Sequence, residues 1–201
     1  MVKFIIFDIG KVILDFDHHV SIKKLSGLSG HSEQEIRDFI FESGLLSSME
    51  KGQITSLDFY RKINDKFKLD ISFNRFKEIW CEIFTPNTSL ESLLYHLTNN
   101  YRLAVLSNTD EMHLKYIYKR YKVFEVFSKK FMSYELKLLK PDVEVFKVVL
   151  ETLKTLPDKC IYIDDLEENV KAAQKTGMHA IQYKSVSQLK TDLAKLNVQV
   201  N

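Results

Sequence analysis

The segment that decides the fold is VKFIIFDIG, residues 2–10. Its nearly continuous run of apolar side chains is typical of a central parallel strand that is buried on both faces. Asp8 and Gly10 come at the end of this run, so a carboxylate is expected at the carboxyl end of a buried strand. Because ligands of open α/β sheets bind outside the carboxyl ends of the strands, we expect a functional site to begin at Asp8.

Further strands are predicted from similar apolar runs at residues 101–107, 159–164 and 178–183, with a weaker run near 130–134. Helices are predicted between them. Leucines at helical spacing follow a predicted capping box of Thr88 and Glu91. Pro141 is expected to open a second helix, and a third over residues 166–176 is expected to stop at Gly177. The alternation predicts an α/β fold with a Rossmann-like parallel sheet.

The segment from about residue 16 to residue 85 interrupts this pattern with predicted helices. Ser32 with Glu35, and Thr55 with Asp58, mark two helix starts. Apolar side chains then recur at helical spacing at Phe59, Ile63, Phe67, Phe76, Ile79, Trp80 and Ile83, and no strand is evident. We therefore predict a core domain of residues 1–16 and 87–201 with a helical domain of residues 17–86 inserted after the first strand.

Composition excludes several classes of protein. The chain has 201 residues, of which 45% are hydrophobic and 28% charged, with a formal charge of +2; this is typical of a globular protein and gives no electrostatic footprint for nucleic acid or an anionic membrane. The two cysteines, Cys81 and Cys160, lack metal-site spacing and suggest buried thiols in a reducing compartment. The apolar run over residues 4–7 is too short for a signal peptide or a membrane span. We expect a cytoplasmic protein.

Polar clusters stand at four predicted strand ends or helix starts: Asp8, Ser107-Asn108, Lys140-Pro141 and Asp164-Asp165. Each has a structural interpretation when it is taken alone, such as a helix N-cap for residues 107–110. The adjacent carboxylates Asp164 and Asp165 are more specific, because they repel each other unless a cation neutralises them. The four clusters together, in this order, indicate one catalytic site.

These segments resemble the haloacid dehalogenase superfamily of aspartyl phosphohydrolases. The resemblance rests on FDIGKVILDFD (residues 7–17), LSNTDEMH (106–113), LKPDVEVF (139–146) and IDDLEENVKAAQKTGMHAI (163–181). It implies a helical cap over residues 17–86. Within the superfamily, the first segment and the cap most resemble the α-D-glucose-1-phosphate phosphatase-like branch.

The resemblance implies a role for each cluster. Asp8 would be the nucleophile that forms an aspartyl-phosphate, and Asp8, the Gly10 carbonyl and Asp165 would bind Mg²⁺, a cation that prefers oxygen ligands. Asp164 would be a further ligand or an acid behind the ligands. Lys140 would offset the charge of Asp8 and of the phosphoryl group.

Three other residues complete the implied site. Ser107 and the Asn108 amide would hold the phosphoryl oxygens at a helix N-terminus. Asn169 would face the site from one helical turn after Asp165 and orient a water on the metal.

One departure from the family pattern concerns Gly10, where most family phosphatases carry an aspartate that acts as general acid and base. The phosphatase branch named above also lacks this aspartate, so glycine alone does not imply inactivity. Asp15, Asp17 or His18 could substitute, although solvated hinge positions are the simpler interpretation. Glu50 and Lys51 lie in a predicted polar loop that could reach the leaving group, or could be a plain turn. His96, His113 and His179 are expected to be structural.

Three functions remain open from sequence. The preferred one is a Mg²⁺-dependent phosphoric monoester hydrolase that acts on a small phosphorylated metabolite, with sugar phosphates as one candidate class. A metal-independent haloacid dehalogenase is the second, although the Asp164-Asp165 pair would be costly without a cation. A non-catalytic phosphate-binding or interaction module is the third, suggested by Gly10. We expect a monomer or weak homodimer that binds neither nucleic acid nor membrane.

Overall fold

The computed structural model describes residues 1–200 and contains a five-stranded parallel sheet in the order β5-β4-β1-β6-β7. The strands are β1 (Phe4–Phe7), β4 (Arg102–Ser107), β5 (Phe127–Met132), β6 (Cys160–Asp164) and β7 (His179–Gln182). The expected α/β core is thus present. The weak run near residues 130–134 belongs to β5, which begins earlier, at Phe127.

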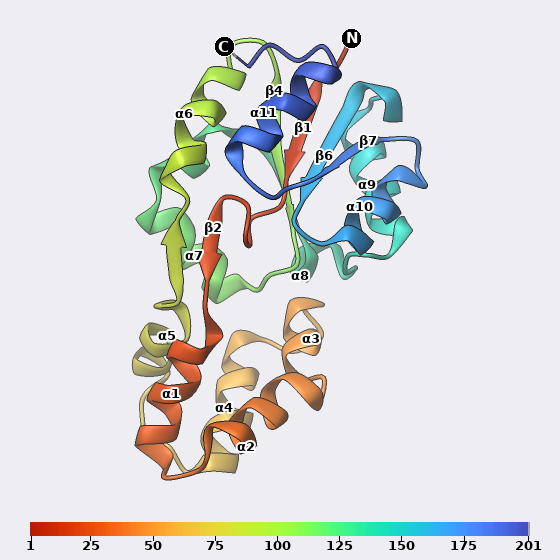
Figure 1. The fold of residues 1–201 in the computed structure, drawn as a ribbon. Helices are drawn as coiled ribbons and strands as arrows, with labels where there is room; N and C mark the ends of the chain where they lie inside the picture. The colour runs from red at the N-terminus through yellow and green to blue at the C-terminus, as the bar shows by residue number, and fades with distance from the viewer. Residues whose placement is uncertain (201) are drawn as a thin grey trace.

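Helices cover both faces of the sheet (Figure 1). They are α6 (Thr88–Leu97), α7 (Glu111–Arg120), α8 (Ser133–Leu136), α9 (Val143–Leu153), α10 (Glu167–Gln174) and α11 (Val186–Lys195), with 3₁₀ segments at Lys122–Val126 and Pro157–Lys159. Successive side chains of β1 point to opposite faces: Ile5 and Phe7 join one apolar cluster, and Phe4 and Ile6 join another. Burial on both faces explains why this strand reads as a continuous apolar run.

A separate layer of helices, residues 18–81, lies beyond the carboxyl ends of the strands (Figure 1). We call it the helical layer. It contains α1 (His18–Ser29), α2 (Glu33–Arg37), a π-helical turn (Asp38–Glu42), α3 (Leu45–Glu50), α4 (Ser56–Phe67) and α5 (Phe73–Cys81). Phe59, Ile63, Phe76, Ile79 and Trp80 form its buried core, as their helical spacing predicts.

Two short antiparallel strands join the helical layer to the sheet, and the sequence did not reveal them. β2 (Leu14–Phe16) pairs with β3 (Phe84–Pro86). The expectation that residues 16–85 contain no strand is therefore wrong at both ends of this segment. Strands of three residues are too short to show a period of two, and only their pairing makes them recognisable.

Three predicted helix boundaries also differ from the structure. Asn87 is the N-cap of α6 in place of Thr88. Its half-buried side-chain amide donates to Val12 O and Tyr183 Oη, at 2.9 and 2.7 Å, which ties the start of the helix to the sheet domain. α9 begins after its N-cap Asp142 and not at Pro141. α10 ends at Gln174, so its C-cap precedes Gly177 by two residues.

None of the helices within residues 1–200 has both the length and the apolar character needed to cross a lipid bilayer. Cys81 and Cys160 are buried free thiols, as expected.

Candidate active site

The carboxyl ends of β4, β1 and β6 lie side by side, since these three strands are neighbours in the sheet. Asp8 directly follows β1, Ser107 ends β4 and Asp164 ends β6. All three side chains are buried. Parallel pairing therefore brings together residues that are as much as 156 positions apart in the chain, as the predicted sheet required.

Lys140 connects two of these carboxylates. Its Nζ lies 2.8 Å from Asp8 Oδ1 and 2.7 Å from Asp164 Oδ2, and its side chain is almost fully buried. Burial alone would lower the pKa of Lys140, but the charges of Asp8 and Asp164 hold the pKa above its ordinary value. The ammonium group is therefore a fixed positive charge next to Asp8.

Asn108 fixes the backbone of Lys140. Its Oδ1 accepts from Lys140 N at 2.9 Å and its Nδ2 donates to Lys140 O at 3.0 Å. The Asn108 side-chain amide is therefore committed to the backbone of Lys140, and the expected contact of the Asn108 amide with a phosphoryl group stays a prediction. Ser107 Oγ, in contrast, has only a weak contact of 3.5 Å to Asn108 O.

Asp164 is surrounded by donors. Its carboxylate accepts from the Lys140 ammonium, the Tyr162 hydroxyl, Asn169 Nδ2 at 3.0 Å and Leu166 N at 2.9 Å. Although burial acts to raise the pKa of Asp164, Lys140 and these donors lower the pKa below its usual value. Asp164 is therefore ionised, and it holds Lys140 and Asn169 in place.

Three carboxylates form a cluster at this edge of the sheet. One ligand atom each from Asp8, Asp164 and Asp165 can be chosen so that all lie within 4.8 Å of one another. Burial, reinforced by the charge of Asp164, raises the pKa of Asp8 to about 6, despite the opposing charge of Lys140. Burial and Asp164 also raise the pKa of Asp165. Both shifts reflect burial first and the neighbouring negative charge of Asp164 second.

The cluster fits a hard divalent cation such as Mg²⁺. Carboxylate oxygens are the ligands that this ion prefers, and its charge would balance the cluster. Asn169 Oδ1 is also buried here without a hydrogen-bond partner in residues 1–200, which suits an acceptor for a water molecule on the ion. Gly10 lies in the turn after β1, where it pairs with Leu14.

Asp15 and Asp17, two candidates for the missing acid–base group, have structural roles. Asp15 is exposed and pairs with Lys11, which lowers the pKa of its carboxyl group. Asp17 caps α1 by accepting from His19 N at 2.9 Å. His18 differs: its ring packs against Phe41, Trp80 and His113, and burial lowers its pKa to about 4.

Two groups near the site have surroundings that the sequence did not reveal, although Glu50 was named as a loop residue that could reach the leaving group. His113, expected to be one of several scattered structural histidines, forms a buried pair with Asp110, with 2.8 Å between Nδ1 and Oδ2. Glu50 ends α3 and is close enough to Asp110, His113, Lys140 and Asp8 for their charges to shift its pKa. The contact between the helical layer and the sheet domain assembles this group, and no sequence pattern records that contact.

Comparison with known proteins identifies relatives over almost the whole chain. Residues 5–183 match the family model described as haloacid dehalogenase-like hydrolase. D-ribitol-5-phosphate phosphatase from Bacteroides thetaiotaomicron is 24% identical over 90% of this chain and 92% of its own length. Sesquiterpene phosphatase astK from Aspergillus oryzae is 26% identical over 88% of this chain and 87% of its own length.

A solved structure shows the same architecture. The haloacid dehalogenase family enzyme BT-2542 from Bacteroides thetaiotaomicron, crystallised with magnesium and inorganic phosphate, superimposes with a TM-score of 0.85 and 29% identity. The match covers 94% of this chain and 99% of that one. The likeness therefore extends to the helical layer as well as the sheet.

Proposed function

Since the chain belongs to the haloacid dehalogenase-like hydrolase family, we propose that it hydrolyses the phosphate monoester of a small metabolite through an aspartyl-phosphate on Asp8. It is a phosphoric monoester hydrolase, and its matched relatives include phosphatases. The observation that carries the proposal is the cluster of Asp8, Asp164 and Asp165 with Lys140 at its centre. A carboxylate nucleophile can approach an anionic phosphate only where positive charge offsets the repulsion.

Each residue of the site has a role in this proposal. Asp8, Asp165 and the Gly10 carbonyl, with Asp164 behind them, would hold Mg²⁺, which supplies charge neutralisation at the phosphoryl group when bound. Lys140 and the Ser107 hydroxyl bind phosphoryl oxygens, and Asn108 contributes by positioning Lys140.

The reaction consists of two transfers at phosphorus. A carboxylate oxygen of Asp8 bonds to phosphorus while the bond from phosphorus to the ester oxygen breaks. The leaving oxygen takes a proton from a solvent water molecule, since residue 10 offers no carboxyl group, and the leaving group departs as an alcohol. Water then attacks the phosphorus of the aspartyl-phosphate and releases inorganic phosphate, which regenerates the Asp8 carboxylate.

The helical layer acts as the cap over this site, so the chain divides into a core of residues 1–16 and 87–201 and a cap of residues 17–86. Closure of the cap would exclude water and confer specificity. Sugar and polyol phosphates are the candidate substrates, supported by the activity of the D-ribitol-5-phosphate phosphatase. Buried free cysteines support a reducing, cytoplasmic location, and we expect a monomer or weak homodimer.

The test is phosphate release from p-nitrophenyl phosphate and from a panel of sugar and polyol phosphates. Asp8→Asn should lower kcat by about 10³-fold or more, because the amide cannot form the acyl phosphate. Asp15→Asn, which alters an exposed aspartate on β2, is the matched control and should keep wild-type activity. EDTA should abolish turnover, and added Mg²⁺ should restore it.

Two outcomes would contradict the proposal. Activity that survives in Asp8→Asn would remove the assigned nucleophile. Chloride release from 2-chloropropionate in EDTA, without phosphatase activity, would establish the dehalogenase alternative instead.

A further inference from the structure

Glu50 is a carboxylate of the helical layer that lies close to the catalytic cluster without a partner of its own. It ends α3, the helix that faces α8 of the sheet domain (Figure 1). Its carboxyl group forms no hydrogen bond or ion pair with the rest of residues 1–200. Burial, reinforced by the charge of Asp110, raises its pKa to about 7. Glu50 is thus a half-buried carboxylate that can accept hydrogen bonds and has no donor among the described residues.

The turn after Glu50 is fixed against the sheet domain. Lys137 Nζ donates to Gly52 O at 2.8 Å. Gly52 has a positive φ of 59°, and a Cβ at this position would overlap the carbonyl oxygen of Tyr134. Because the backbone is seated this closely, the position of Glu50 relative to Lys140 and Asp8 is set by the fold.

Two more polar atoms in this region are buried without partners in the described chain, His18 Nδ1 and Trp80 Nε1. Both rings pack against His113, with centroid distances of 5.9 and 5.6 Å, and His113 in turn interacts electrostatically with Glu50. Buried polar atoms normally have hydrogen-bond partners. Several unpaired atoms around one histidine therefore point to a polar ligand between the helical layer and the sheet.

We propose that Glu50 determines substrate specificity by accepting hydrogen bonds from hydroxyl groups of the leaving group, so that the enzyme prefers phosphate esters of polyols and sugars to those of apolar alcohols. This inference rests on the proposed phosphatase function. An apolar leaving group would cover the Glu50 carboxyl group without giving it a hydrogen-bond donor. A buried carboxyl group without a donor costs binding free energy, so the site would select against apolar esters. The matched relatives include both a ribitol-phosphate and a sesquiterpene phosphatase, so hydroxylated and apolar leaving groups both occur among them.

The test compares kcat/KM for D-ribitol 5-phosphate, D-glucose 6-phosphate and n-hexyl phosphate in the wild type, Glu50→Gln and Glu50→Leu. The ratio of kcat/KM for the hydroxylated esters to that for the hexyl ester should fall about 10- to 100-fold in Glu50→Leu, the range expected for loss of a hydrogen bond to a charged group. Glu50→Gln retains an acceptor oxygen, so the ratio should fall less in this variant than in Glu50→Leu. If kcat/KM falls only for ribitol 5-phosphate, Glu50 recognises an open-chain polyol. If it falls only for glucose 6-phosphate, Glu50 recognises a ring sugar.

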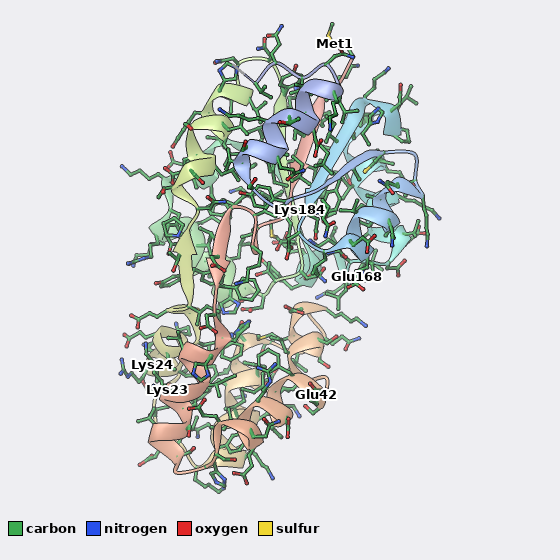
Figure 2. All side chains as sticks on the ribbon, viewed as in Figure 1. Met1, Lys23, Lys24, Glu42, Glu168 and Lys184 are labelled. Carbon is green, nitrogen blue, oxygen red and sulfur yellow. The ribbon has the colours of Figure 1, made fainter. Side chains whose placement is uncertain are left out.

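Glu42→Leu is the matched control, because Glu42 is an exposed carboxylate of the same layer (Figure 2) and should leave the ratio unchanged. An unchanged ratio in Glu50→Leu, or an equal fall for all three esters, would overturn the proposal. A wild type that cleaves none of the esters, nor p-nitrophenyl phosphate, would instead overturn the phosphatase function and this inference with it.

A binding measurement keeps the inference testable without turnover. In an Asp8→Asn background, calorimetry should show that Glu50→Leu weakens the binding of ribitol 5-phosphate more than the binding of hexyl phosphate. Equal midpoints of thermal unfolding for the two proteins would show that both are folded. Equal affinities of the Asp8→Asn proteins with and without Glu50→Leu for ribitol 5-phosphate and for glucose 6-phosphate would contradict the proposal.

Discussion

Gly10 occupies the position at which most family phosphatases carry an acid–base aspartate, and the structure gives a steric reason for the glycine. A Cβ at residue 10 would lie 2.7 Å from Phe16 Cε1. Phe16 is itself held in β2, where its ring packs against Phe84 and His18. The ring of Phe16 therefore occupies the space that an aspartate side chain would need.

An aspartate at residue 10 should therefore destabilise the folded protein unless Phe16 is also replaced by a smaller residue. Gly10→Asp is expected to lower the free energy of unfolding by about 1–3 kcal/mol, the usual cost of overpacking. Phe16→Ala should relieve this cost, so urea unfolding of the two single variants and the double variant should give a favourable coupling energy of about 1 kcal/mol or more. Strictly additive effects would show that the aspartate fits beside Phe16 after all.

At the residue scale, the sequence predicted the carboxylates better than their surroundings. Asp8, Asp164 and Asp165 directly follow apolar runs, so strand pairing alone places them together. Lys140 lies in a loop that has no periodicity, and only the family resemblance indicated it. The sequence did not reveal the environment of Glu50, because that environment depends on how the helical layer sits on the sheet.

At the scale of elements, His113 holds α7 of the sheet domain against α5 of the helical layer. Its Nδ1 pairs with Asp110, and its Nε2 lies 3.2 Å from Trp80 O. Burial opposes the charged form, but Asp110 raises the pKa of His113 above its ordinary value, while His113 keeps the pKa of Asp110 low in spite of burial. Both ring nitrogens of the imidazolium are therefore donors, one to each element.

Replacing His113 with glutamine should destabilise the protein in a pH-dependent way. Removing one partner of a buried pair costs about 3–5 kcal/mol. Because the folded pKa of His113 lies above the unfolded value of 6.5, its contribution is complete below pH 6.5 and is lost as the pH rises through the folded value.

Urea unfolding of the wild type and His113→Gln from pH 6 to pH 9 checks this expectation. The difference in unfolding free energy should be largest at pH 6 and should shrink toward pH 9. His179→Gln alters an exposed histidine and is the control, with little effect at any pH. A difference that stays constant with pH would show that His113 is neutral in the folded protein.

The sequence predicted helix boundaries correctly where hydrogen bonds between neighbouring residues set them. The capping boxes at Ser32 and Thr55 are confirmed, since both of their hydrogen bonds form within four residues. Thr88 has the same pattern, yet it is the first residue of α6, and Asn87, whose side chain bonds to the distant Val12, is the N-cap. β2 and β3 escaped prediction because each contributes only three residues and depends on a partner about 70 positions away.

At the scale of the whole molecule, the helical layer contacts the sheet domain at two separated places. One is the ribbon of β2 and β3 with the α5–α7 contact. The other is the tip of α3 and the turn at Gly52, which rests on α8 (Figure 1). The first is covalently continuous and the second is not, so, if the helical layer is the proposed cap, the second is the contact that opens to admit substrate.

Gly52→Ala should therefore impair closure without unfolding the protein. The new methyl group would collide with the carbonyl oxygen of Tyr134, and the positive φ would add backbone strain. Gly44→Ala separates these two causes, because Gly44 lies in the same layer with a φ of +77° and open space around its Cβ. We expect Gly52→Ala to lower kcat/KM for the best substrate about tenfold beyond Gly44→Ala, consistent with the loss of precise positioning. Steady-state kinetics with equal thermal stability of the two variants would establish this, whereas matching kinetics would show that strain alone accounts for the effect.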